Sequence, residues 1–130
     1  MKVTDVKGMY TLEVNTKGTI VKEKQSGAWK SEDMKRYQKD YESKIAPLLK
    51  GKKWAKCCDL IDYKMSMIVE DMAQHVKWAT DAGLTSGAII VSNIVVKMQM
   101  KRGDAGLTSP EAFVTEKEAL DYLSAQGFNF

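Results

Sequence analysis

The fold of this chain is decided by a short apolar stretch, Trp54-Ala55-Lys56-Cys57-Cys58-Asp59-Leu60-Ile61, which contains neither glycine nor proline. Stretches of this length and composition are typical of a strand buried on both faces, as at the centre of a mostly parallel sheet. A second compact apolar stretch follows at residues 88–91, after a pattern that predicts a helix over residues 67–82. Strands that alternate with helices predict a parallel sheet covered by helices.

The residues before this stretch predict an antiparallel hairpin and a helix. Apolar and polar side chains alternate over residues 9–15, which predicts a half-buried strand, and a turn containing Gly18 leads to a second strand over residues 19–24. A helix is predicted over residues 32–49, because apolar residues recur there at spacings of three and four: Met34, Tyr37, Tyr41, Ile45 and Leu48. Gly51 and Gly83 are placed to end the first and second helices, as glycine commonly does.

The residues after it predict two more helices and one more strand. A third helix is predicted over residues 94–102, a strand at residues 113–114, and a last helix that begins at Thr115, which has the capping-box spacing to Glu118. The predicted order is β-β-α-β-α-β-α-β-α, an α/β fold with a five-stranded mixed, mostly parallel sheet. The 130 residues suit a single domain spanning 1–130, since domains most often have about 100–150 residues.

Composition excludes several classes of protein. The chain is 44% hydrophobic, which is too much for a disordered protein, and its net charge is only +3. Basic residues concentrate at Lys50, Lys52, Lys53 and Lys56, which we interpret as a solvated loop. Arginine is scarce in this basic half, whereas proteins that read nucleic acids favour arginine, so no nucleic-acid partner is expected. No secretory signal or membrane-spanning stretch is visible in the sequence.

The cysteines and the histidine do not suggest a disulfide or a metal site. Cys57 and Cys58 are adjacent, and neighbouring side chains on a strand point to opposite faces, which is unsuited to a disulfide. His75 is the single histidine, so a zinc site would lack ligands, and no metal or cofactor is expected. Reduced, buried thiols are consistent with the reducing cytoplasm. We interpret His75 as a structural residue that can pair with Asp71, one turn earlier.

Four segments carry a family resemblance. They are the opening hairpin at residues 10–14, the strand that ends in Asp59-Leu60-Ile61-Asp62, residues 88–93 followed by 98–102, and residues 112–114 with the helix over 116–123. Together they resemble the STAS domain, and most closely the small stand-alone bacterial proteins described as anti-sigma-factor-antagonist-like. The resemblance implies a non-enzymatic regulatory or protein-interaction module of the bacterial cytoplasm, as a homodimer or with a protein partner. Kinship with a lipid-carrier fold implies the alternative role of a carrier or sensor of an apolar small molecule or lipid.

In true anti-sigma antagonists, the turn between the third strand and the second helix has an Asp-Ser-Ser-Gly-type sequence and accepts a phosphate on serine. This chain has Asp62-Tyr63-Lys64-Met65-Ser66 at that place, with neither the Asp-Ser pair nor the glycine. Ser66 is the hydroxyl at the start of the second helix, where the helix N-terminus would favour a phosphate. An unmodified helix N-cap is the alternative role of Ser66.

Methionines and a nearly all-apolar third helix mark a candidate ligand or interface surface. Methionine side chains adapt to irregular apolar surfaces, and a helix that is apolar all round is buried on more than one side. Ordinary core, a dimer interface and an apolar pocket stay open as roles for these residues, which are Met65, Met67, Met72, Ile94, Val95, Met98 and Met100. A cationic face made of Lys97, Lys101 and Arg102 suits either an anion or a solvated helix C-terminus.

Asp59 and Asp62 are the candidates for chemistry, because they follow the predicted central strand, where open α/β sheets place their ligands. Two carboxylates there could bind Mg²⁺ or accept a phosphoryl group, which is the less favoured hypothesis of an enzyme or phosphoacceptor. Structural pairing with Lys53 or Lys64 is the preferred interpretation. No phosphate-binding glycine loop or nucleophile elbow is present, so we predict no catalytic residue and no enzyme.

Overall fold

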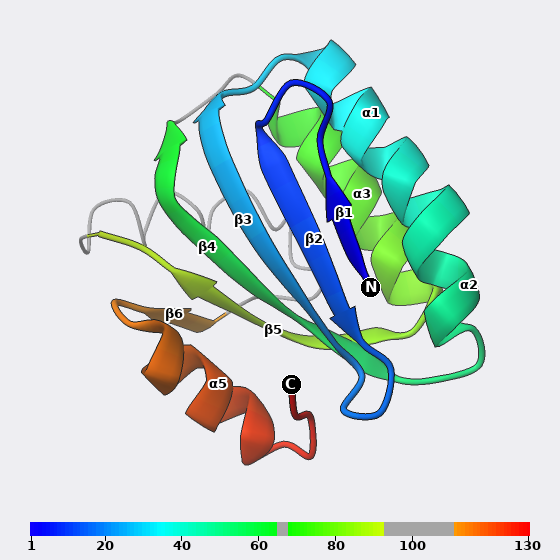
Figure 1. Cartoon of the computed structure of the whole chain (residues 1–130), viewed down its shortest axis with the longest axis vertical. Coiled ribbons are helices and arrows are strands. Elements are labelled where there is room, and N and C mark those ends of the chain that lie inside the picture. The colour runs from blue at the N-terminus through cyan, green and yellow to red at the C-terminus, as the bar shows by residue number, and fades with distance from the viewer. Residues whose placement is uncertain (65–67, 93–110) are drawn as a thin grey trace.

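The chain forms an α/β fold around one mixed sheet (Figure 1). The structure is a computed structural model that describes residues 1–64, 68–92 and 111–130. The strands lie side by side in sequence order, β1 to β3 antiparallel and β3 to β6 parallel. Their bounds are β1 (Lys2–Thr4), β2 (Tyr10–Asn15), β3 (Ile20–Ala28), β4 (Trp54–Lys64), β5 (Leu84–Ile90) and β6 (Glu111–Phe113). The mixed α/β sheet predicted from the sequence is thereby confirmed.

The helices occur where the apolar spacing predicted them, with one local irregularity. The helix predicted over residues 32–49 is a continuous helical segment, made of α1 (Ser31–Asp40), a π-helical turn η1 (Tyr41–Ile45) and α2 (Ala46–Leu49). The other helices are α3 (Val69–Asp81) and α5 (Glu116–Ser124). Thr115 caps α5 as predicted, since its hydroxyl oxygen accepts a hydrogen bond from the Glu118 amide at 3.2 Å. No helix among the described residues is long and apolar enough to cross a membrane.

The sheet departs from the prediction in its number of strands. The described residues form six strands, whereas the sequence predicted five. The additional strand is β1, which pairs with β2 and places Val3 opposite Leu12. Three residues are too few to show an alternating pattern, so β1 could not be predicted from periodicity. The predicted helix over residues 94–102 lies outside the described residues, and with it the part of the predicted order between β5 and β6.

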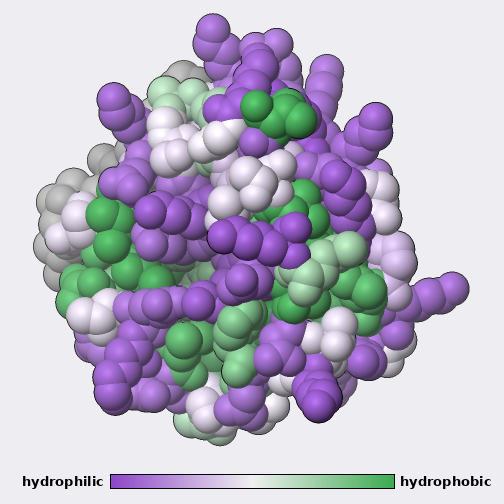
Figure 2. Space-filling view, in the orientation of Figure 1, coloured by the Kyte–Doolittle hydropathy of each residue, from purple (hydrophilic) through white to green (hydrophobic). Residues whose placement is uncertain are grey.

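The two faces of the sheet have different coverings (Figure 1). On the first face, α1, α2 and α3 cover a large core cluster that contains Tyr10, Leu12, Tyr37, Tyr41 and Trp54. On the second face, α5 covers a smaller cluster over β4, β5 and β6. The same face over β1, β2 and the outer part of β3 carries polar side chains that are half-buried or exposed. Figure 2 shows hydrophilic side chains across the middle of the molecule, where Figure 1 has β2, β3 and β4.

Cys57 and Cys58 belong to different faces of β4, as predicted. Both are free and buried, with Cys57 in the cluster beneath α5 and Cys58 in a separate cluster on the opposite side. Burial raises the pKa of the Cys57 thiol to about 12, and burial also raises the pKa of Cys58 well above its ordinary value. Because the thiolate is the reactive form, neither side chain is suited to redox or nucleophilic chemistry.

We therefore expect both thiols to resist modification in the native protein. An aromatic disulfide reagent added at neutral pH should label neither cysteine at an appreciable rate, because the thiols are protonated and buried. The same reagent should label both thiols once the chain is unfolded in denaturant, and that total is the internal control. Rapid labelling of either cysteine in the native protein would show that β4 is more accessible than the structure indicates.

Candidate functional site

A buried polar network lies between the sheet and the helices of its first face. At its centre, Glu23 on β3 and Lys56 on β4 form an ion pair, with Lys56 Nζ 3.1 Å from Glu23 Oε2. The two residues are only 3% and 7% exposed, which is unusual for charged side chains unless they are paired. The parallel pairing of β3 with β4 brings the two together, because it sets Val21 beside Lys56 and Glu23 beside Cys58.

Three further donors converge on the Glu23 carboxylate. The Tyr37 hydroxyl lies 2.7 Å and 2.8 Å from its two oxygens, the Tyr41 hydroxyl donates to Oε2, and Gln25 Nε2 donates to Oε1 at 2.9 Å. Both tyrosines are present because α1 runs into the π-helical turn η1, which keeps Tyr37 and Tyr41 on the side of the sheet. Burial raises the pKa of Glu23, but the charge of Lys56 and the tyrosine hydrogen bonds together hold that pKa below its ordinary value.

His75 extends the network from the sheet to the helices. Its Nε2 lies 2.5 Å from Lys56 Nζ, and its Nδ1 lies 2.5 Å from the side-chain carbonyl oxygen of Gln38 on α1. An ammonium group can only donate, so Nε2 accepts from Lys56 and Nδ1–H donates to Gln38. This assignment makes the imidazole neutral. Burial, and then the charge of Lys56, hold the pKa of His75 well below 6.5.

The network is sealed within the protein. Glu23, Lys56, His75, Tyr37 and Tyr41 are each less than a tenth exposed. Aromatic rings enclose the Lys56 ammonium, which lies 4.4 Å from the ring centroid of Tyr41. A general acid or base must reach a proton of its substrate, and these groups reach each other instead. The arrangement can hold charges and orient helices, and it does not present a nucleophile or base at the surface.

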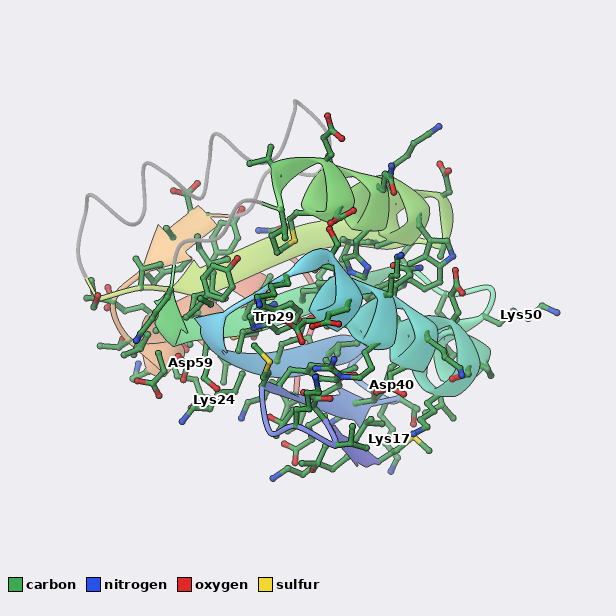
Figure 3. The ribbon with its side chains drawn as sticks, turned by 90° about the horizontal axis from the view of Figure 1, so that it is seen from above. Lys17, Lys24, Trp29, Asp40, Lys50 and Asp59 are labelled. Carbon is green, nitrogen blue, oxygen red and sulfur yellow. The ribbon has the colours of Figure 1, made fainter. Side chains whose placement is uncertain are left out.

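The two carboxylates singled out in the sequence do not form a metal or phosphoryl site. An irregularity in the pairing of β3 with β4 sets Lys24 beside Asp59 and Ser26 beside Asp62. Asp59 Oδ1 accepts a hydrogen bond from the Ile61 amide at 3.0 Å, and Asp62 Oδ2 lies 3.7 Å from Lys24 Nζ. Figure 3 shows Lys24 and Asp59 together on the side of the sheet away from α1 and α3. Structural pairing is thus observed for Asp62, with Lys24 in place of the predicted Lys53 or Lys64.

Charged side chains form a row across the second face of the sheet. Lys2 on β1 pairs with Glu13 on β2, and Glu13 pairs with Lys22 on β3. Lys22 Nζ then lies 2.6 Å from Glu116 Oε1 at the start of α5. We call these four residues the charged row. They line a cleft of about 200 Å³ together with Lys24 and Asp59, and the thiol-bearing residue Cys57 lies among its walls.

Most of the other predicted site residues cannot be placed. Met72, on α3, is half-buried against the large core cluster of the first face, which is ordinary core. The remainder lie outside the described residues and stay predictions: Met65, Ser66, Met67, Ile94, Val95, Lys97, Met98, Met100, Lys101 and Arg102. Within the described residues, no three side chains of histidine, cysteine, aspartate or glutamate converge as a metal site.

The buried network was missed in the sequence, although one signal for it is present. Lys56 was assigned to a solvated basic loop, and the structure corrects this, because Lys56 is buried within β4. A lysine inside an apolar stretch that is predicted to be buried on both faces requires a carboxylate partner. The predicted pairing of His75 with Asp71 is also replaced, since His75 contacts Lys56 and Gln38, and Asp71 accepts a hydrogen bond from Ser31.

No family model, curated protein or solved structure matches this chain. Function must therefore be inferred from the fold and from the contacts of the described residues. Two features carry that inference, namely the sealed network on the first face and the charged row on the second.

Proposed function

We propose that the chain is a non-enzymatic, STAS-like interaction module that associates with a second copy of itself. Two observations support a role without chemistry. The most perturbed titratable groups are buried against one another on the first face, and Asp62, beside Asp59, is paired with Lys24. An antiparallel opening followed by parallel strands is also what the resemblance to STAS domains implies.

The charged row is the observation that carries the proposal of self-association. Across the second face its signs run positive, negative, positive, negative, through Lys2, Glu13, Lys22 and Glu116. Such a row reverses sign about its midpoint. A two-fold axis parallel to the strands and between β2 and β3 therefore sets each charge opposite its complement in the second copy. Glu13 faces Lys22, Lys2 faces Glu116, and each contact occurs twice, as an isologous interface requires.

The second face suits a protein partner better than an apolar small molecule. Six charged side chains line the cleft on this face: Lys2, Glu13, Lys22, Lys24, Asp59 and Glu116. Sites for small apolar ligands are lined mostly by hydrophobic and aromatic side chains, with few polar groups. The residues that motivated the alternative of an apolar-ligand carrier, from Ile94 to Met100, lie outside the described part of the chain.

Sedimentation of charge variants tests this proposal. At low ionic strength we expect the wild-type protein to form dimers at high micromolar concentration and to dissociate as salt screens the charged row. Glu13→Lys should weaken the dimer at least tenfold, because it sets like charges opposite each other twice. The double variant Glu13→Lys with Lys22→Glu restores opposite signs at these contacts and should recover association. Glu70→Lys makes the same substitution on exposed α3 and should have no effect.

The outcomes separate the two parts of the proposal. A strict monomer at millimolar concentration and low salt would overturn self-association. A dimer that Glu13→Lys and Glu70→Lys leave equally unchanged would overturn the charged row as its interface. Far-ultraviolet circular dichroism of each variant shows that the fold is retained, so that lost association is not confused with unfolding.

A further inference from the structure

Helix α3 is attached to the core by few apolar side chains. Its fully buried residues are His75 and Ala79, while Met72 and Trp78 are only partly buried. The largest buried side chain of α3 is therefore a polar and titratable imidazole. Hydrophobic burial scales with apolar area, so an alanine and two half-buried side chains hold a helix weakly. The position of α3 thus depends on the hydrogen bonds of His75.

The groups that face His75 come from every element packed around it. From β4 comes the Lys56 ammonium, and the Glu23 carboxylate on β3 lies behind that ammonium. From α1 come the Gln38 carbonyl and the Tyr37 ring, at 4.6 Å between centroids, and η1 contributes the Tyr41 ring at 4.9 Å. On α3 itself, the Trp78 ring lies at 5.8 Å. Among the described residues, the charge next to the imidazole is a cation.

We propose that His75 is an acid-sensitive latch, whose protonation releases α3 from α1 and from the sheet while the rest of the fold persists. A protonated Nε2 becomes a donor and faces the donating Lys56 ammonium. The imidazolium also adds a second positive charge to a site where one carboxylate, Glu23, already neutralises Lys56. Two buried cations with one counter-charge are relieved when α3 swings outward and His75 reaches water.

The direction of the pH dependence follows from the neutral state of docked His75. With α3 docked, burial and Lys56 keep the pKa of His75 well below 6.5, and with α3 released the pKa returns to that ordinary value. The released state therefore binds more protons between these two values. Docking is strongest above about pH 6.5 and weakens as the pH falls through this window, by about tenfold for each unit of pH.

Loss of the buried and paired carboxylates occurs at lower pH than release of α3. The pKa of Asp5 is lowered by its hydrogen bond to Arg36, and that of Glu23 by Lys56 and the tyrosines against its burial. Their stabilisation is complete above the ordinary values of 3.8 and 4.5 and is lost only as the pH falls below them. His75 is the single histidine of the chain, so it is the side chain expected to titrate between these values and neutrality.

Amide hydrogen exchange with a matched variant tests the latch. His75→Gln keeps the contacts without the charge, because its carbonyl can accept from Lys56 and its amide can donate to Gln38. After correction for the intrinsic pH dependence of exchange, wild-type α3 amides should lose protection at least tenfold from about pH 7 to about pH 5.5, a window that spans the ordinary histidine pKa. Amides of β2, β3 and β4 should keep theirs, and in His75→Gln the protection of α3 should not change with pH.

Three results would overturn the latch. Protection of α3 in the wild type that does not depend on pH would do so, as would an equal dependence in His75→Gln. Loss of protection in α3 and the central strands together would show global unfolding instead of a local release. Should His75→Gln not fold, the imidazole proton resonances of the single histidine decide the matter. They must titrate in parallel with the loss of α3 protection.

Discussion

Replacing Glu23 with glutamine is expected to lower the free energy of unfolding by about 3–5 kcal/mol, the usual cost of breaking a buried ion pair from one side. Glutamine has nearly the same shape, so the change removes charge without leaving a cavity. The Lys56 ammonium, 3.1 Å from the carboxylate, then stays buried with no counter-charge, and two tyrosine hydroxyls lose a charged acceptor. Urea denaturation followed by tryptophan fluorescence measures the change.

Two companion variants decide whether the charge is responsible. The double variant Glu23→Gln with Lys56→Met removes both charges and should recover much of the lost stability, because the buried cation is gone. Asp121→Asn breaks the exposed pair that Asp121 forms with Lys117 at 2.8 Å, and should change stability little. A cost for Glu23→Gln no larger than that for Asp121→Asn would contradict the role assigned to the buried pair.

Acid should weaken the same network from another side, because His75 and Glu23 respond to pH at different values. The latch predicts a first loss of order below about pH 6.5, confined to α3, and the carboxylates predict a second, global loss below about pH 4.5. Two separate transitions are therefore expected in the wild-type protein. The network thus couples the position of α3 to the ion pair that holds β3 and β4 together.

Local sequence patterns predicted the elements of this fold well where the pattern was long enough. The alternation over residues 9–15 predicted β2, and the apolar stretch from Trp54 predicted β4. The capping-box spacing of Thr115 and Glu118 predicted the start of α5. Each of these signals lies within a few residues, so it needs no knowledge of the tertiary structure. β1 has only three residues and gave no such signal.

The sites could not be predicted in the same way, because their residues meet only in three dimensions. His75 contacts Gln38 across 37 positions in sequence and Lys56 across 19. Lys56 follows three nearby lysines, and that neighbourhood resembled a solvated loop more than a buried strand. The charged row depends likewise on β1, since Lys2 reaches Glu13 only through the pairing of β1 with β2. Burial of charge is a property of the assembled layers, and local composition does not encode it.

Replacing Gly83 with alanine should be the other severely destabilising single substitution. Gly83 ends α3 with a φ of +108°, a conformation that costs a residue with a side chain about 1–3 kcal/mol. An added Cβ would also lie 2.4 Å from the backbone oxygen of Lys52 and 3.3 Å from the ring of Trp54. Backbone cannot move as a flexible side chain does, so we expect about 1–3 kcal/mol more from overpacking.

Gly51 provides the matched control for this prediction. It also has a positive φ, +79°, but an added Cβ there meets nothing within 4 Å. Gly51→Ala therefore carries the conformational cost alone, about 1–2 kcal/mol. Thermal unfolding of both variants measures the difference, which isolates the close approach of Lys52 to the end of α3. Equal losses in the two variants would show that the loop before β4 adjusts to the methyl group. A larger loss in Gly83→Ala would show that this junction between α3 and β4 is rigid.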